Sequence, residues 1–187
     1  MRVLLLRKDP SARARVHSVA LGHSRPDIKL ALARQGGPGG ESIEEQWTLD
    51  DRPARGLREA LSDVAPDLIH CHESAALTVT AIELTAGRIP VLYDHDDSHR
   101  DGNGADLQRR AVEECSALIV PSQEELERLR AQFALPPVTC VFPNYPLSHE
   151  LPYDEREHCA EANIGRIASL YERLSREPLA GLRGGLT

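Results

Sequence analysis

Short apolar runs alternate with longer amphipathic segments along most of the chain, and this alternation constrains the fold more than any other feature of the sequence. The apolar runs are too short for helices and are rich in Leu, Val and Ile, as strands buried on both faces are. Strands that are joined by helices run parallel, through right-handed crossovers. The sequence therefore predicts an α/β fold, with a parallel sheet of six or seven strands and helices on both faces.

The apolar runs and the segments between them give the expected elements. Strands are expected at Arg2–Arg7, Ile28–Ala33, Glu45–Leu49, Leu68–Cys71, Pro90–Tyr93, Ala117–Val120 and Val138–Phe142. Helices are expected at Ser11–Gly22, Arg52–Val64, Ser74–Thr85, Ala105–Cys115 and Ser122–Phe133. Ser122 followed by Glu124 and Glu125 is typical of a helix start, because it offers a capping hydroxyl and then acids at the positive end of the helix dipole.

The last part of the chain has a different pattern, typical of one longer helix over Asp154–Arg176. One face of this helix carries an apolar stripe at helical spacing, formed by Ala160, Ile164, Ile167, Tyr171 and Leu174. We therefore expect one domain over residues 1–146, followed over residues 147–187 by a linker and a C-terminal helix. This helix is expected to pack on the sheet and not to form a separate domain.

Composition excludes several classes of protein. Hydrophobic residues make up 41% of the chain and aromatic residues 4%, so the core must be aliphatic. No apolar run approaches the roughly 20 residues of a membrane span, and the N-terminus lacks the pattern of a signal peptide, so we expect a cytoplasmic protein. The four cysteines are widely spaced, which favours reduced thiols over a disulfide or zinc framework. They are Cys71, Cys115, Cys140 and Cys159.

Charge is distributed unevenly along the chain. The net charge is −7, yet residues 1–34 carry an excess of Lys and Arg. An acidic body argues against nucleic acid as a partner. The basic segment is either a site for one anionic ligand or a solvated helix face, and its composition leaves both open.

Four segments together resemble a known family. They are Pro66–Ser74 (PDLIHCHES), Pro90–Asp96 (PVLYDHD), Glu114–Glu125 (ECSALIVPSQEE) and Val141–Pro146 (VFPNYP). In this order they resemble the N-terminal, acceptor-side domain of retaining family 4 glycosyltransferases. Those enzymes have the GT-B architecture, in which two Rossmann-like domains face each other across a cleft. The resemblance covers about residues 1–146 and implies a single Rossmann-like domain.

The resemblance does not extend to a donor domain. In the family, the motif that contains Asn144 leads into a second domain that binds the nucleotide sugar, whereas residues 147–187 show no second α/β pattern. Asn163–Glu177 is instead similar to the family's last helix, which returns to pack on the first domain. The resemblance thus implies a half-enzyme that needs a donor domain in trans to transfer a hexosyl group. The alternative is a non-catalytic binding or regulatory module that acts through protein–protein association.

Ligands of open α/β sheets bind beyond the carboxyl ends of the strands, which selects the candidate site residues. The resemblance places His95 near the acceptor hydroxyl, where it would hydrogen-bond the sugar or transfer a proton. The other reading of His95 is a helix cap or a backbone contact. His70 and His72 are expected on opposite faces of their strand, with His70 under a helix. The expected substrate-binding residues are Lys8, Arg13, Arg15, His72, Glu73, Asp96, Arg100, Ser122 and Asn144.

Metal, cofactor and partners follow from the same residues. The run Asp94–His99 holds carboxylates and imidazoles, which suit Mn or Zn, but successive strand residues do not converge, so we predict no metal and no cofactor. The first loop has no glycine, and Lys8, Arg13 and Arg15 could instead hold a phosphate or carboxylate beside a helix N-terminus. Expected partners are a sugar or phosphorylated small-molecule acceptor and either a second copy or a separate donor-domain chain. Nucleic acid and a membrane span are not expected.

Overall fold

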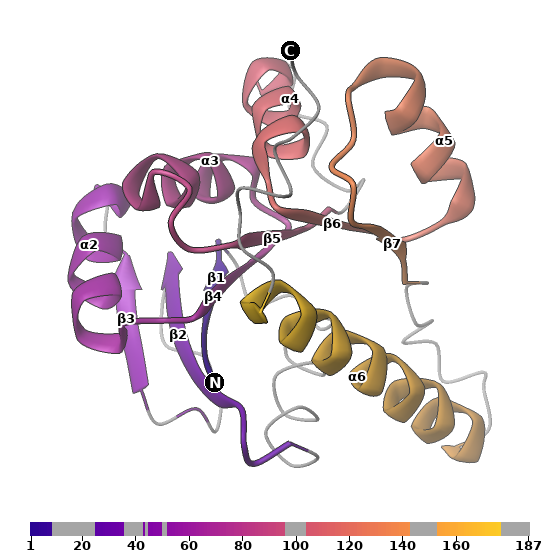
Figure 1. Cartoon of the computed structure of the whole chain (residues 1–187), viewed down its shortest axis with the longest axis horizontal. Helices are drawn as coiled ribbons and strands as arrows, with labels where there is room; N and C mark the ends of the chain where they lie inside the picture. The colour runs from indigo at the N-terminus through magenta and orange to yellow at the C-terminus, as the bar shows by residue number, and fades with distance from the viewer. Residues whose placement is uncertain are drawn as a thin grey trace.

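A seven-stranded parallel sheet forms the centre of the molecule (Figure 1). The computed structural model describes residues 1–8, 25–35, 43, 45–49, 52–95, 104–142 and 153–176, with side chains of the last range from Asn163 onward. The strands are β1 (Arg2–Arg7), β2 (Lys29–Gln35), β3 (Glu45–Leu49), β4 (Leu68–His72), β5 (Val91–Asp94), β6 (Ala117–Val120) and β7 (Thr139–Val141). Their order is β3-β2-β1-β4-β5-β6-β7, and every pair is parallel. The predicted α/β fold is therefore confirmed.

The strands are buried on both faces, as the continuous apolar runs indicate. In β1, Val3 to Leu6 are at most 1% exposed. Leu4 and Leu6 contribute to the apolar cluster on one face, and Val3 and Leu5 to the cluster on the other. This alternation assigns each strand residue to a face, because successive side chains point to opposite sides of a sheet.

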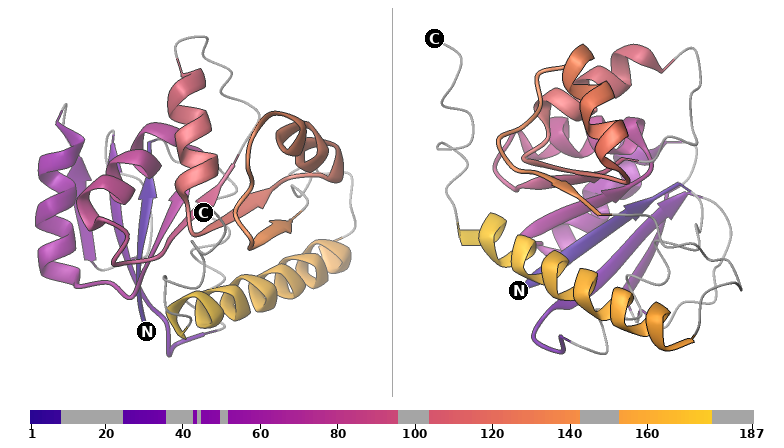
Figure 2. Two further views of the ribbon diagram at one scale, coloured as in Figure 1. Left: turned by 45° about the horizontal axis from the view of Figure 1, so that its top comes forward. Right: turned by 90° about the vertical axis from the view of Figure 1, so that its right-hand side faces the viewer.

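Helices cover both faces of the sheet (Figure 2). One cluster includes side chains of α2 (Pro53–Val64), α3 (Ala75–Thr85), α4 (Ala105–Glu114) and α5 (Gln123–Gln132). The other face packs against α6 (Tyr153–Arg176). We call these the α3 face and the α6 face.

Side-chain caps begin two of these helices. The Ser122 hydroxyl accepts a hydrogen bond from the Glu125 N–H at the start of α5, as predicted, and Ser74 does the same for Leu77 at the start of α3. The helix expected at 11–22 lies outside the described residues.

The predicted stripe of α6 is its buried face. Ile164, Ile167, Tyr171 and Leu174 are at most 4% exposed, and Ala160 lies outside the side chains that the structure describes. An ion pair of 2.5 Å between Arg25 Nη2 and Glu172 Oε1 links α6 to the turn before β2. The helix is thus part of the same packed unit as the sheet, while the domain boundary at residue 146 stays a prediction. No helix of the described part of the chain is long and apolar enough to cross a membrane.

The expectation that His70 and His72 face opposite sides of β4 is wrong. Residues i and i+2 of a strand share a face, and the two rings lie 3.9 Å apart between centroids on the α6 face. The other half of the expectation holds, because His70 Nδ1 lies 2.6 Å from the Tyr171 hydroxyl and so packs under α6.

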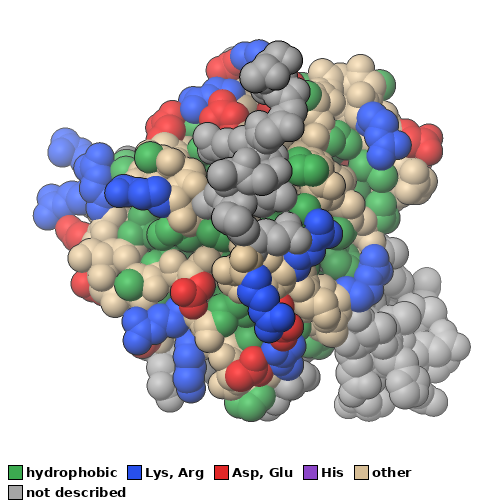
Figure 3. All heavy atoms as spheres, viewed as in Figure 1, with side chains coloured by type: hydrophobic (Ala, Val, Ile, Leu, Met, Phe, Trp, Pro, Cys, Tyr) green, Lys and Arg blue, Asp and Glu red, His purple; other side chains and the backbone are tan. Residues whose placement is uncertain are grey.

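The face shown in Figure 3 carries basic, acidic and apolar side chains interspersed with one another. Among the described residues, the single large hydrophobic side chain counted as exposed is Leu107, at 37%.

Candidate functional site

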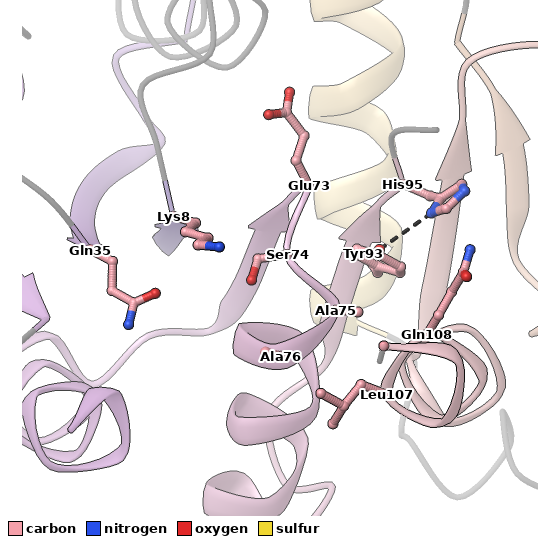
Figure 4. A pocket seen from close by; sticks show the side chains of 11 residues that line it. Lys8, Gln35, Glu73, Ser74, Ala75, Ala76, Tyr93, His95, Leu107 and Gln108 are labelled. Atoms are coloured by element: carbon pink, nitrogen blue, oxygen red, sulfur yellow. Dashed lines mark hydrogen bonds between the residues drawn. The ribbon is translucent and has the colours of Figure 1, made fainter. Parts of the chain in front are cut away.

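A pocket of about 400 Å³ opens at the carboxyl ends of β1, β2, β4 and β5 (Figure 4). Lys8 and Gln35 form one side, His95 and Gln108 the other, and Ser74 lies between them. Its position agrees with the rule that open α/β sheets bind ligands beyond their strand ends. The lining residues are Lys8, Gln35, Glu73, Ser74, Ala75, Ala76, Tyr93, His95, Gly104, Leu107 and Gln108.

Glu73 occupies the turn between β4 and α3 in an unusual backbone conformation. Its φ of 59° lies in the left-handed region, which is unfavourable for a residue with a Cβ atom. A hydrogen bond of 2.9 Å from its N–H to the Asp94 carbonyl fixes this turn against β5. Backbone strain of this kind concentrates at binding and catalytic sites. Glu73 is also one of the residues that line the pocket.

His95 follows β5 and lines the pocket, but most of its ring is buried. The residue is 3% exposed, and its N–H bonds to the Ile119 carbonyl at 2.9 Å. Its Nε2 lies 2.7 Å from Glu125 Oε1, and its Nδ1 lies 3.3 Å from the Tyr93 hydroxyl. A carboxylate hydrogen-bonded to one ring nitrogen orients an imidazole. The Nδ1 contact is the longer and weaker of the two.

Glu125 is the partner that sequence reasoning did not assign to the site. Its other oxygen accepts a 2.7 Å hydrogen bond from Arg128 Nε. Burial opposes the charged form, but the hydrogen bonds from Arg128 and His95 outweigh burial and lower the pKa of Glu125 below its ordinary value. Glu125 is therefore a carboxylate at neutral pH, and it presents a negative charge to His95. This carboxylate thus links Arg128 to His95.

A second polar cluster lies on the α6 face, beneath the strand ends. His72 Nδ1 is 3.3 Å from Asp94 Oδ2, and His70 Nε2 is 4.0 Å from the same oxygen. Burial and the nearby charge of Asp94 raise the pKa of Tyr171 above its ordinary value, so its hydroxyl stays protonated and can donate to His70. This cluster joins β4, β5 and α6.

Within the described part of the chain, His70, His72 and Asp94 form a group of side chains that could hold a metal ion. One ligand atom from each of His70, His72 and Asp94 lies within 4.8 Å of the others, and all three residues are buried. Arg7 is 1% exposed and lies opposite His72 in the register of β1 and β4. A fixed positive charge thus already lies beside this cluster and opposes a cation there.

Arg7 and Arg34 are two further charged residues that sequence reasoning left out of the site. They are 1% and 7% exposed and lie directly opposite each other in β1 and β2. Both follow the alternation of Leu5 and Leu32, which places them on the α6 face. In the sequence they look like polar ends of apolar strands, and only the strand pairing brings them together.

The structure brings three of the predicted site residues together. Lys8, Glu73 and His95 line the pocket. His72 lies on the α6 face with Asp94, and Ser122 is exposed and caps α5. The remaining predicted residues lie outside the described part of the chain: Arg13, Arg15, Asp96, Arg100 and Asn144.

Comparison with known proteins gives one family and several similar folds. The model of Glycosyltransferase Family 4 matches residues 5–145. A sucrose-phosphate synthase structure from Thermosynechococcus elongatus superposes with a TM-score of 0.70 at 14% identity, over 93% of this chain and 99% of that one. No curated protein sequence matches the chain.

Two UDP-N-acetylglucosamine 2-epimerases are also similar, both with a TM-score of 0.57. The enzyme from Neisseria meningitidis, solved bound to UDP-GlcNAc, is 15% identical and is matched over 76% of this chain and 46% of its own. The enzyme from Rickettsia bellii is 13% identical, over 95% of this chain and 52% of its own. This chain thus spans about half the length of each epimerase. At such identities the likeness shows the fold alone.

Proposed function

Because this chain belongs to Glycosyltransferase Family 4, we propose that the pocket at its strand ends is the acceptor side of a sugar-transfer site whose sugar donor is held by a second domain in trans. The observation that carries this proposal is the pairing of His95 with Glu125 at the wall of the pocket. The reaction is transfer of a hexosyl group from a nucleotide sugar to a hydroxyl of the acceptor.

His95 works through its Nδ1. With Nε2–H donating to the Glu125 carboxylate, Nδ1 is the nitrogen that accepts a hydrogen bond. Its present contact with the Tyr93 hydroxyl is 3.3 Å long, so a substrate hydroxyl can replace it at little cost. In that position His95 orients the acceptor hydroxyl or takes its proton, and Glu125 stabilises the imidazolium that would form.

The other pocket residues suit a polyhydroxylated ligand. Lys8 and Gln108 offer donors, and Glu73 offers an acceptor. Leu107 supplies a partly exposed apolar wall, against which the less polar face of a sugar ring can pack. Such a set of a few polar groups around an apolar surface is typical of small-molecule sites.

The proposal assigns the donor to a second domain because transfer needs both substrates in a defined geometry. Rate enhancement by orientation requires that the reacting atoms be held about 3–3.5 Å apart. The pocket lies at one edge of a single sheet, and the family resemblance places the nucleotide sugar on a facing domain. The chain alone is therefore expected to bind acceptor and not to turn over.

Binding measurements test the assignment of the site. Titration of the full chain with hexoses and hexose phosphates by calorimetry should give saturable binding, which His95→Ala and Glu125→Gln weaken. Glu124→Gln is the matched control, since Glu124 is exposed on the same turn of α5 and should leave binding unchanged. Unchanged binding in His95→Ala would count against the site. Saturable binding of UDP- or GDP-sugars by this chain alone would count against a donor domain in trans.

The second candidate is a binding module that acts through association with a protein, including a second copy of this chain. The described surface gives it little support, because Leu107 is the one large hydrophobic side chain there that is exposed, and stable interfaces need a larger apolar core. Light scattering after size exclusion distinguishes the two. A stable dimer or hetero-complex that forms without sugar would favour the binding module.

A further inference from the structure

Two guanidinium groups are buried side by side at the carboxyl ends of β1 and β2. Arg7 and Arg34 are directly opposite in register, and adjacent strands lie about 4.8 Å apart. Both side chains point to the α6 face and are more than nine-tenths buried. Like charges held this close in a dry environment repel each other, so Arg34 needs a compensating negative charge of its own.

The described carboxylates do not supply that charge to Arg34. No ion pair joins Arg34 to a described residue, and its Nη1 is buried without a hydrogen-bond partner. Asp94 is the buried carboxylate of this face, but it lies three strands away, about 14 Å, and contacts His72. A buried charge with an unsatisfied donor is strongly destabilising unless a ligand completes it.

The strand ends place these two arginines next to the pocket. The residues that follow them, Lys8 and Gln35, both line it. Because successive residues point to opposite faces, Arg7 and Arg34 approach the ends of β1 and β2 from the α6 face, and Lys8 approaches from the α3 face. Lys8 and Gln35 lie on the opposite side of the pocket from His95 (Figure 4), and Arg7 and Arg34 directly precede them at the ends of β1 and β2.

From this geometry we infer that Arg7 and Arg34 form a phosphate subsite, which binds the phosphoryl group of a phosphorylated acceptor. The inference rests on the proposed function for the identity of the acceptor, while the subsite itself follows from the buried arginines. A phosphate dianion matches the charge better than a carboxylate does, since more than one cation faces the site. The guanidinium fork is also suited to bind two phosphate oxygens at once.

Inorganic phosphate is the probe for this subsite. Calorimetry and urea unfolding of the full chain are compared in phosphate, acetate and chloride at equal ionic strength. Phosphate should bind saturably and raise the urea midpoint above its values in acetate and chloride. Arg34→Met, which keeps the length of the side chain and removes its charge, should bind phosphate at least about 30-fold more weakly. Arg130→Met, at an exposed arginine of α5, should bind as the wild type does.

Stability without phosphate separates a ligand site from a structural role. If the charge of Arg34 is compensated only when an anion binds, Arg34→Met should be at least as stable as the wild type in chloride. The variant has lost a buried charge that is uncompensated there. Arg34→Lys should retain weakened phosphate binding, since it keeps the charge and loses the fork. A wild type that does not distinguish phosphate from chloride overturns the inference, as does an Arg34→Met variant that binds phosphate normally or is destabilised in chloride.

The two proposals fail in different ways. His95→Ala should retain full affinity for inorganic phosphate, because His95 lies across the pocket from Lys8 and Gln35, the residues that follow the two arginines (Figure 4). Loss of hexose binding with phosphate binding intact would remove the His95 site and leave the subsite standing. Hexose binding with no response to phosphate would remove the phosphate subsite and leave the His95 site standing.

Discussion

Glu125 fits a local sequence pattern, but its side chain makes a contact with a distant residue instead. Ser122 and Glu125 have the spacing of a capping box, in which the glutamate side chain would return to the backbone of the serine. The structure uses the serine half of that pattern, and the glutamate side chain turns instead to His95 and Arg128. The cap could be predicted from the sequence. The contact with His95, which lies 30 residues away, depends on β5 ending beside α5.

Replacement of Glu125 by glutamine tests this pairing. Glu125→Gln should cost about 1.5–3 kcal/mol at neutral pH, because hydrogen bonds from His95 and Arg128 to a buried charge are weakened. Urea unfolding measures this cost, and Glu124→Gln should stay within about 0.5 kcal/mol of wild type.

The pH dependence of the same variant has a defined sign. The pKa of Glu125 is lowered in the folded state, so its contribution is complete above the unfolded value of about 4.3 and is lost as the pH falls through the folded value. The stability difference between wild type and Glu125→Gln should therefore shrink on acidification below about pH 4.3. If the stability difference between wild type and Glu125→Gln were equal at neutral and acidic pH, the fold would not favour the charged form of Glu125.

Helix ends are the features of the elements that the sequence located best. The sequence Ala65-Pro66-Asp67 stops α2, and Ala86-Gly87 stops α3. Both helices end in a left-handed residue, with φ of 45° at Ala65 and 48° at Ala86. Glycine is the usual residue at such a position, because a Cβ atom is strained there. These two ends thus combine a correct stop signal with an unfavourable side chain.

A glycine at the end of α2 should stabilise the protein. In the folded state Ala65→Gly removes the left-handed strain while the hydrogen bond from this N–H to the Leu61 carbonyl remains. The expected net gain is about 1 kcal/mol in the free energy of unfolding by urea. Ala131→Gly, inside α5, is the control of opposite sign, because glycine there only weakens a helix. A loss of stability in Ala65→Gly would show that the left-handed conformation of Ala65 is not a source of strain.

Over the whole molecule, the hydrophobic periodicity of the sequence predicted more of the structure than its motifs did. The apolar runs located the strands to within about two residues, and the α6 stripe identified Ile167 and Leu174 as core residues, because burial requires such patterns. The strand order was not available from the sequence, since pairing depends on contacts between distant segments. Arg7 and Arg34 were therefore missed, and His70 and His72 were assigned to opposite faces by a wrong use of strand alternation.

Buried ionisable groups on both faces of the sheet predict how the whole molecule responds to alkali. Burial raises the pKa of Cys71 to about 12. Burial and the neighbouring Cys71 raise that of Cys115 above its ordinary value, and burial with Asp94 does the same for Tyr171. In the unfolded chain thiols ionise near pH 8.5 and a tyrosine near pH 10. Above these values the unfolded state has lost protons that the folded state retains.

Stability should therefore be unaffected by these groups below about pH 8.5 and fall as the pH rises, by about 1.4 kcal/mol per pH unit for each group that ionises only on unfolding. Urea unfolding at neutral pH, near pH 9.5 and near pH 11 measures the slope. Tyr171→Phe loses the contact with His70 and should cost about 1–3 kcal/mol at neutral pH. Above about pH 10 it should lose stability less steeply than wild type, since only the wild type has a tyrosine here to ionise on unfolding. Equal slopes for both proteins in that range would mean that Tyr171 is not held protonated by the fold.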